Sequence, residues 1–206
     1  GLMLAKMRNG GAACTAANRV YVQKSIAEQF TKEFAQAMSQ LKMGRGTETG
    51  IQLGASVSIK ERNKIAELVD AAVKAGGKVH TGGKTPDGDG AFYPATVISV
   101  DKNNDILNHE VFGPVAPIVT FDTDAEAIQL ANSTDFGLIS YVFSKDLARA
   151  IRTAEAIESG MVAINKGVIS DPAAPFGGVK QSGLGREGGF DGIHEFLETK
   201  YIGVEI

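Results

Sequence analysis

The sequence predicts an α/β protein with a mostly parallel, open sheet and helices on both faces of that sheet. Two observations lead to this class. Segments with the alternating apolar pattern of strands take turns with segments whose apolar residues recur every three or four positions, as on one face of a helix. The connections between them are short, and such alternation favours parallel strands covered by helices.

Residues 1–77 are expected to form a short helix, a strand and two longer helices. The short helix covers residues 2–7 and the strand covers residues 18–23. Ser25 with Glu28, and Ser58 with Glu61, have capping-box spacing, so each pair is expected to open a helix. The apolar positions of these helices are Ile26, Phe30, Phe34, Met38 and Leu41, then Ile65, Leu68, Val69, Ala72 and Val73. Gly76 and Gly77 are expected to end the second helix.

The alternation continues through residues 78–165. Thr123 and Glu126 repeat the capping-box spacing and predict a helix that extends to Asn132. A second helix is expected over residues 146–157. Strands are predicted over residues 78–81, 95–100, 115–121, 139–143 and 161–165.

The glycine-rich C-terminal region has one motif that needs care. Residues 183–188, Gly-Leu-Gly-Arg-Glu-Gly, match GxGxxG letter for letter. A dinucleotide-binding motif of this kind also needs a preceding strand and an acidic residue about 20 positions later. The preceding residues are typical of a loop, and the sequence ends at Ile206. We therefore interpret the motif as a tight loop before a last helix over residues 191–197.

The final residues carry an alternating apolar pattern at Ile202, Val204 and Ile206. This pattern predicts a half-buried strand, and an unpaired apolar strand edge needs a neighbour. We expect a domain over residues 1–198 and a C-terminal arm over residues 199–206. The alternative is that the arm folds back on its own domain.

Composition limits the classes of function. The 206 residues carry a net charge of −3 and are 43% apolar, which gives no basic surface for nucleic acid. No apolar run approaches the roughly 20 residues that span a bilayer, and no signal-peptide core is visible. A single cysteine excludes an internal disulfide, and the three histidines lack ligand spacing, so no metal site is expected. These features favour a cytoplasmic protein that binds neither nucleic acid nor membrane.

The single cysteine, Cys14, is the strongest candidate for a catalytic residue. Two glycines and four alanines surround it in the stretch Arg-Asn-Gly-Gly-Ala-Ala-Cys-Thr-Ala-Ala-Asn-Arg, residues 8–19. Small neighbours leave a thiol open to substrate, and the flanking cations Arg8 and Arg19 favour the reactive thiolate. The alternative is a buried cysteine that acts as a small apolar residue.

Glu110 and Phe112 form a second candidate, in the stretch Asn-His-Glu-Val-Phe-Gly-Pro, residues 108–114. An acidic residue and an aromatic residue two positions apart, just before a strand, could hold a sugar and cover a ring. The alternative is an ordinary glutamate in a turn.

Five segments in order resemble the aldehyde dehydrogenase family, and together they cover almost the whole chain. A single such segment would be weak support, whereas five in the same order are strong. They are residues 10–14 around Cys14, residues 110–114, residues 131–144, Gly160–Asn165, and Pro175–Gly183.

The resemblance implies a catalytic domain and a role for each matching residue. Cys14 would be the nucleophile that forms a covalent thioester, and its backbone N–H would donate to the oxyanion. Glu110 would hold the nicotinamide ribose of NAD or NADP, and Phe112 would pack beside the cofactor ring. Phe176 would line the substrate tunnel. The resemblance also suggests a homo-oligomer that pairs through the C-terminal strand.

A narrower resemblance is to the succinate-semialdehyde dehydrogenases. Arg8 lies six residues before the nucleophile, and Ser170 lies on the loop before Pro175, so both would bind the substrate carboxylate. The alternative for Arg8 is an ion pair with a structural carboxylate. An acidic residue, Asp171, departs from what a carboxylate site favours. A dehydrogenase for another aldehyde therefore stays open.

The family resemblance also shows what these residues lack. The cofactor-binding domain, the general-base glutamate and the oxyanion-binding asparagine all precede the nucleophile in the family, but only thirteen residues precede Cys14 here. We expect that the isolated 206-residue chain does not turn over aldehyde. A non-catalytic domain is the remaining alternative.

Overall fold

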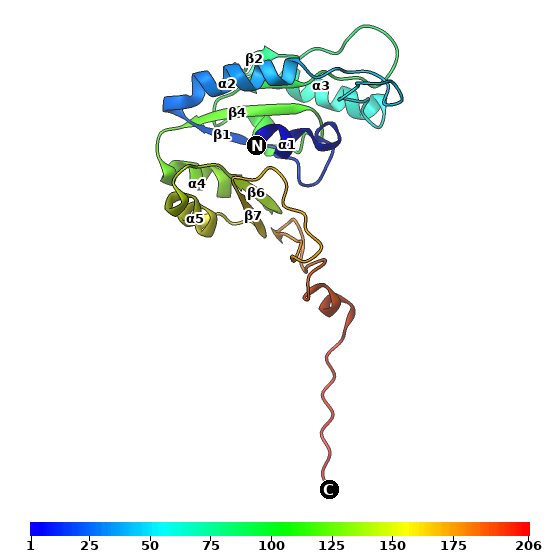
Figure 1. Cartoon of the computed structure of the whole chain (residues 1–206), viewed down its shortest axis with the longest axis vertical. Coiled ribbons are helices and arrows are strands. Elements are labelled where there is room, and N and C mark those ends of the chain that lie inside the picture. Colours follow the sequence, from blue (N-terminus) through cyan, green and yellow to red (C-terminus); the bar gives the residue numbers. More distant parts are fainter.

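The central element of the fold is a four-stranded sheet in a computed structural model that describes residues 1–206 (Figure 1). The strand order is β1 (Val20–Gln23), β4 (Val115–Phe121), β3 (Thr96–Ser99) and β2 (Lys78–Thr81). β1 pairs parallel with β4, β4 pairs parallel with β3, and only β2 is antiparallel to its neighbour. The mostly parallel sheet predicted from the sequence is confirmed.

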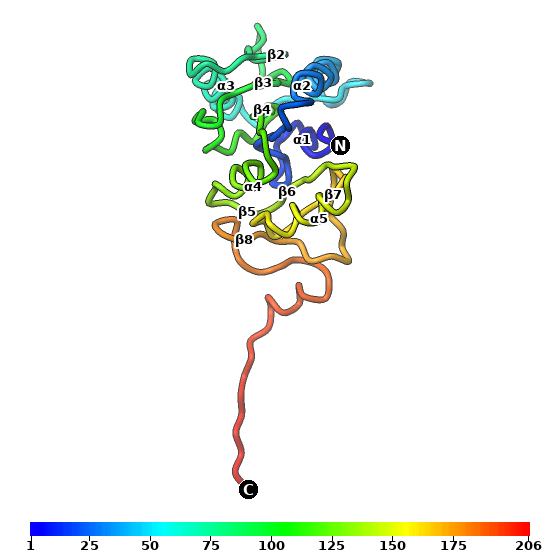
Figure 2. The backbone as a smooth tube through the Cα atoms, turned by 90° about the vertical axis from the view of Figure 1, so that its left-hand side faces the viewer, coloured from blue at the N-terminus to red at the C-terminus, as the bar shows by residue number.

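Two long helices cover opposite faces of this sheet. Figure 2 shows α2 (Lys24–Ser39) and α3 (Ile59–Lys74) on either side of β3 and β4. Alternate residues of β3 point to opposite faces of the sheet. Val97 packs in the cluster under α2, and its neighbour Ile98 packs in the cluster under α3. Both side chains are fully buried. This period of two is what places helices on both faces.

A second, smaller layer holds the remaining helices and strands. Its parallel strand pair, β6 (Ile139–Val142) with β7 (Met161–Ile164), and its helices lie below the main sheet in Figure 1. α1 (Leu2–Met7) lies between the two layers in both backbone views. A short 3₁₀ turn, η1 (Arg8–Gly11), follows α1, and another, η2 (Asp105–Asn108), precedes β4. The elements of this layer are α4 (Asp124–Asn132), β5 (Phe136–Gly137), β6 (Ile139–Val142), α5 (Leu147–Ala156), β7 (Met161–Ile164) and β8 (Val179–Lys180).

The predicted helix starts are confirmed in two cases and wrong in one. The Ser58 and Thr123 hydroxyls accept hydrogen bonds from the Glu61 and Glu126 backbone N–H groups, each at 3.2 Å. The Ser25 cap is wrong, because β1 runs directly into α2 at Gln23 and Ser25 lies inside the first helical turn. The buried face of α2 is shifted with it, and Ile26 is 54% exposed.

The C-terminal region also differs from the sequence prediction. The last helix is a short 3₁₀ helix, η3 (Gly192–Phe196), rather than an α-helix over residues 191–197. Three glycines of the 183–188 motif have positive φ, from +69° to +108°, which fits the tight loop that we predicted. Residues 197–206 extend away from the body without pairing to a strand, so the division at residue 198 and the arm's partner stay predictions (Figure 1). No helix reaches the combination of length and apolar character that crossing a membrane requires.

Candidate active site

Cys14 lies on an exposed turn after η1. The turn is closed by a hydrogen bond from the Ala16 N–H to the Ala13 carbonyl oxygen at 2.9 Å. No hydrogen bond in the structure uses the Cys14 N–H as a donor, so that group is free to bind an oxyanion. The exposure of Cys14 excludes the alternative of a buried apolar cysteine.

The turn is presented by a run of three left-handed residues, Asn9, Gly10 and Gly11, with φ between +49° and +79°. The Asn9 side-chain amide donates to the Ala12 carbonyl oxygen at 2.9 Å and closes this run. Gly11 has no room for a side chain, because a Cβ atom there would overlap the Gly113 carbonyl oxygen. The loop of the nucleophile therefore packs directly on the turn that carries Glu110.

Tyr141, which lies on β6, connects the Cys14 turn to the lower layer. Its hydroxyl donates to the Thr15 carbonyl oxygen at 2.8 Å. Burial is the main cause that raises the pKa of Tyr141, so the phenol stays protonated and can donate this bond. The bond ties β6 to the turn of the nucleophile.

The two flanking arginines have different environments. Arg8 is exposed and forms none of the ion pairs in the structure, so its partner stays a prediction. Arg19 donates to the Leu130 and Ala131 carbonyl oxygens, at 3.3 and 3.0 Å, at the C-terminal end of α4. Its guanidinium also lies over the Tyr21 ring. Arg19 therefore has a structural role at the end of α4, and its effect on the Cys14 thiolate stays a prediction.

Glu110 and Phe112 lie on a strained turn before β4. Both side chains are exposed, and Phe112 has a φ of +49°, a conformation that aromatic residues rarely adopt. The Asn18 side chain holds the turn: its Nδ2 donates to the His109 carbonyl oxygen at 2.7 Å, and its Oδ1 accepts from the Val111 N–H at 3.0 Å. The turn therefore presents a carboxylate and an aromatic ring to solvent.

A buried lysine lies beneath this turn. Lys6, on α1, is 1% exposed, and its Cε atom lies beside Gly11. Burial lowers the pKa of Lys6 to about 8, and the charge of Glu110 acts in the opposite direction. Lys6 is therefore a buried amine that packs under the contact between the nucleophile loop and the Glu110 turn.

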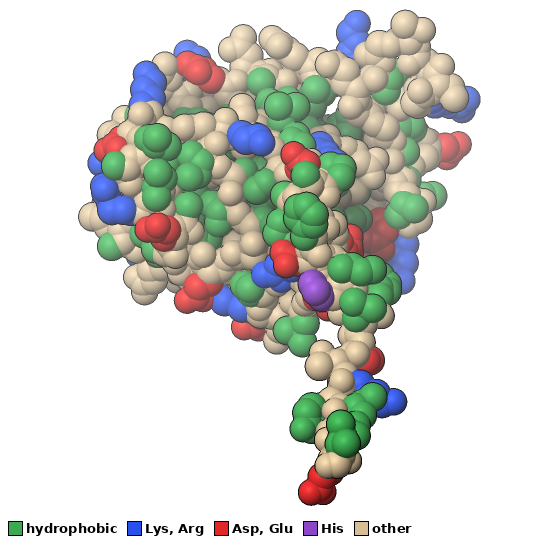
Figure 3. Space-filling model, turned by 60° about the horizontal axis from the view of Figure 1, so that its bottom comes forward, with side chains coloured by type: hydrophobic (Ala, Val, Ile, Leu, Met, Phe, Trp, Pro, Cys, Tyr) green, Lys and Arg blue, Asp and Glu red, His purple; other side chains and the backbone are tan.

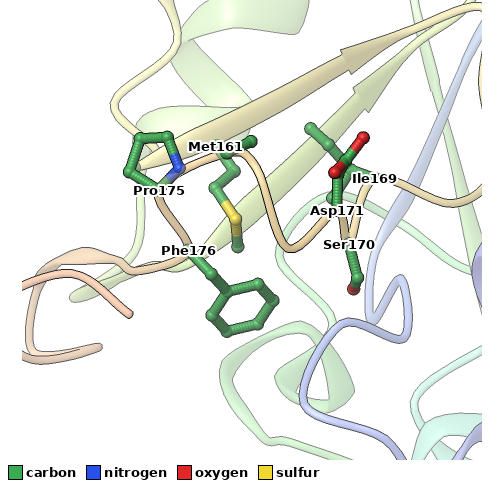
Figure 4. Close-up of a pocket in the computed structure, with 8 residues that line it drawn as sticks. Met161, Ile169, Ser170, Asp171, Pro175 and Phe176 are labelled. Atoms are coloured by element: carbon green, nitrogen blue, oxygen red, sulfur yellow. The ribbon is translucent and has the colours of Figure 1, made fainter. Parts of the chain in front are cut away.

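Ser170 and Phe176 line one pocket of about 170 Å³ (Figure 4). Met161, at the start of β7, points toward the Phe176 ring, and Ile169 and Asp171 lie on the facing loop. The Asp171 carboxylate accepts from the Ala173 N–H at 2.9 Å, so it stabilises its own turn. Gly167, in the same loop, packs on the backbone of α1, which ends just before Arg8.

The structure brings the predicted residues together in two groups: Glu110 and Phe112 share a turn, and Ser170 and Phe176 share a pocket. Cys14 and Arg8 lie on one short loop, six residues apart. Sequence reasoning missed Tyr141, Asn18 and Lys6. The one sequence signal for Lys6 was its place among the apolar residues of a short helix. Tyr141 and Asn18 gave no such signal, because their partners are about 90 or more residues away in the sequence.

Two of the three histidines make hydrogen bonds outside the candidate site. His80 pairs with the Ser99 hydroxyl at 2.7 Å, and His109 pairs with Asp105 at 2.9 Å. No three side chains of His, Cys, Asp or Glu gather into a set that could hold a metal ion.

The structure thus presents an exposed thiol on a glycine-rich loop, and this loop packs on the turn that carries an exposed carboxylate and an exposed aromatic ring. The chain belongs to the aldehyde dehydrogenase family, whose family model matches residues 1–202. Members of this family are oxidoreductases that use NAD(P).

Individual relatives agree with this assignment. The chain is 55% identical to the succinate-semialdehyde dehydrogenase of Paenarthrobacter nicotinovorans, over 99% of this chain and 46% of that protein. It is 43% identical to a glutarate-semialdehyde dehydrogenase of Pseudomonas putida, over 100% of this chain and 43% of the relative. The crystal structure of the succinate-semialdehyde dehydrogenase from Burkholderia pseudomallei superposes with a TM-score of 0.92 at 42% identity, over 95% of this chain and 41% of that chain. The chain thus spans less than half the length of these relatives.

Proposed function

We propose that this chain is the nucleophile-bearing part of an NAD(P)-dependent dehydrogenase that oxidises succinic semialdehyde to succinate. The observation that carries the proposal is that Arg8 and Cys14, both exposed, lie on one short loop, six residues apart. A cation on the same loop as an exposed thiol suits a substrate with an aldehyde at one end and a carboxylate at the other. The 55% identity to a succinate-semialdehyde dehydrogenase supports the same substrate.

The proposed chemistry at Cys14 uses its exposed thiol and its free backbone N–H. The thiolate adds to the aldehyde carbon, and the Cys14 N–H donates to the oxyanion that develops. NAD(P), when bound, supplies the acceptor for the hydride that leaves the substrate carbon, so that a thioester remains on Cys14. Water then hydrolyses the thioester, releases the carboxylic acid and restores the thiol.

The Glu110 turn fits a nicotinamide ribose. A carboxylate that is exposed and held by a fixed backbone can accept hydrogen bonds from two neighbouring ribose hydroxyls, and the exposed Phe112 ring offers a flat apolar surface beside it. In this role the two side chains bind and orient, and they exchange no proton with the substrate.

The substrate carboxylate is assigned to Arg8 and Ser170. The Arg8 guanidinium offers two parallel donors that match carboxylate geometry. The loop that carries Ser170 rests on α1 through Gly167, and the same helix positions Arg8. Asp171 is next to Ser170, but its carboxylate is engaged with the Ala173 N–H, which reduces its conflict with a negatively charged substrate.

The test replaces the matching segment of the Paenarthrobacter enzyme with this chain and compares it with the Arg8→Ala variant. Succinic semialdehyde and uncharged butanal are the two substrates. A charge-assisted hydrogen bond worth roughly 1.5–3 kcal/mol predicts that kcat/KM falls about ten- to hundred-fold more for the charged substrate. Equal losses on both substrates would return Arg8 to a structural role.

The same assay separates a second substrate class. Relatives at 43% identity include a glutarate-semialdehyde dehydrogenase, whose named substrate is one methylene longer. A higher kcat/KM for glutaric than for succinic semialdehyde would replace the proposed substrate. A folded chimera that binds NAD(P) but oxidises no aldehyde would favour a non-catalytic domain.

We further propose that residues 199–206 pair with a second copy of the chain. Tyr201, Ile202, Val204 and Ile206 are each at least 73% exposed, and Figure 3 shows these apolar side chains standing clear of the body. Deletion of residues 200–206 should lower the oligomer mass measured by light scattering. An unchanged mass would favour an arm that folds on its own domain.

A further inference from the structure

We propose that Asn18 is a positioning residue that holds the Glu110 turn at a fixed place relative to Cys14. Its side-chain amide bonds to the residue on each side of Glu110: Nδ2 donates to the His109 carbonyl oxygen, and Oδ1 accepts from the Val111 N–H. Asn18 itself follows Cys14 by four residues. The functional part of this inference rests on the proposed role of Glu110 in cofactor binding.

The clamp is needed because regular strand pairing stops short of the turn. β1 begins at Val20 and pairs parallel with β4, with Val20 opposite Ile118. The chain before β4 bends sharply at Phe112, whose φ is positive, so the backbone of the turn cannot continue the ladder. The Asn18 amide supplies one donor and one acceptor in the place of a backbone partner.

The clamp works together with close packing. Gly11 lies against the Gly113 carbonyl oxygen, and Val111 is 1% exposed, so the base of the turn is buried on the side of the nucleophile loop. Glu110 and Phe112 project from that base into solvent. Loss of the clamp should therefore free the turn and its two exposed side chains while the Cys14 turn keeps its own bonds to Asn9 and Tyr141.

The chemistry of the clamp makes two variants informative. Asn18→Leu has a similar size and removes both hydrogen bonds. Asn18→Asp keeps the acceptor for the Val111 N–H but removes the donor to the His109 carbonyl oxygen. Asn103→Leu is the matched control, because Asn103 is exposed and its side chain makes no hydrogen bond in the structure.

The first measurement uses the 206-residue chain alone. Hydrogen exchange at the Val111 N–H should be at least ten-fold faster in Asn18→Leu and less affected in Asn18→Asp. Cys14 is the only thiol, so its alkylation rate by iodoacetamide reports on the nucleophile turn without interference. That rate should stay within two-fold in all three variants.

The second measurement uses the chimera with the Paenarthrobacter enzyme and titrates NAD(P) by calorimetry. Asn18→Leu should raise the Kd at least ten-fold, while the Asn103→Leu control leaves it unchanged. Unchanged exchange at Val111, or an alkylation rate that changes as much as the Kd, would overturn the positioning role. Because neither readout requires turnover, a chimera that binds NAD(P) without oxidising aldehydes would count against the proposed function alone.

Discussion

The Tyr141 hydroxyl donates a hydrogen bond of 2.8 Å to the carbonyl oxygen of Thr15, the residue that follows Cys14. The bond joins β6 of the lower layer to the turn of the nucleophile, across 126 positions of sequence. Burial raises the pKa of Tyr141, so the phenol stays protonated and continues to donate throughout the neutral range. The bond therefore restrains the nucleophile turn under all conditions in which an enzyme of this kind would work.

Removal of this hydroxyl should loosen the nucleophile turn. In Tyr141→Phe the carbonyl oxygen of buried Thr15 loses its side-chain donor, and we expect the free energy of unfolding to fall by about 1–2 kcal/mol. The alkylation rate of Cys14 should change by more than two-fold, because the position of the thiol is less restrained. Urea unfolding and a timed iodoacetamide reaction measure the two effects. Tyr201→Phe, at a 91% exposed position, is the control, and an equal result in both variants would contradict this role.

The contact between Gly11 and Gly113 makes a second prediction. In Gly11→Ala the new methyl group would overlap the Gly113 carbonyl oxygen, and the φ of +79° disfavours any side chain. We expect a loss of at least about 2 kcal/mol in the free energy of unfolding. Gly46→Ala provides the control, because a Cβ atom at Gly46 meets nothing within 4 Å. Chemical denaturation of both variants should give a large loss for the first only; similar values would mean that the loops separate at little cost.

Two serines test what local sequence can and cannot predict about helix starts. Ser58 and Ser25 have the same spacing to a glutamate, yet only the Ser58 hydroxyl accepts a backbone hydrogen bond at a helix start. Ser58→Ala should therefore cost about 1 kcal/mol, and Ser25→Ala should be close to neutral. Thermal unfolding of the two variants makes the comparison, and a loss at Ser25 as large as that at Ser58 would restore the predicted cap.

The physical reason for this difference lies outside the helix itself. The pattern of apolar residues correctly predicted the strands of the main sheet, because alternate residues of β3 and β4 serve the two covered faces. It could not show that β1 would enter α2 without a connecting loop. The two-residue strands β5 and β8 were missed for a related reason, since neither is long enough to show any period.

The candidate site was predictable to the extent that its residues carry motifs. Cys14, Glu110 and Phe176 lie in segments that resemble the family, so each could be named before the structure. Asn18 and Tyr141 act through side-chain hydrogen bonds to backbone groups that are distant in sequence. The residues next to Asn18 and Tyr141 in sequence do not predict those partners. Arg19 was singled out for its closeness to Cys14 in sequence, and its bonds to the carbonyl oxygens of α4, more than 110 positions away, could not be predicted from that neighbourhood.

Lys6 predicts an unusual dependence of stability on pH. Burial lowers its pKa from 10.5 to about 8, so between these two values the folded chain binds fewer protons at Lys6 than the unfolded chain does. The contribution of Lys6 to the free energy of unfolding should therefore rise with pH from about 8 to 10.5, by about 3 kcal/mol in total. Below pH 8 the full cost of burying the charge is present.

Lys6→Met should remove this dependence while it keeps a flexible side chain of similar length. We expect the variant to be more stable than the parent at pH 7, by up to about 3 kcal/mol, and the difference to shrink as the pH approaches 10.5. Urea denaturation at several pH values measures it, and subtracting the two curves cancels the other groups that titrate in that range. Lys32→Met, at an exposed position of α2, should give a curve parallel to that of the parent. If Lys6→Met also runs parallel to the parent, the buried lysine carries no such cost, and the charge of Glu110 offsets its burial in full.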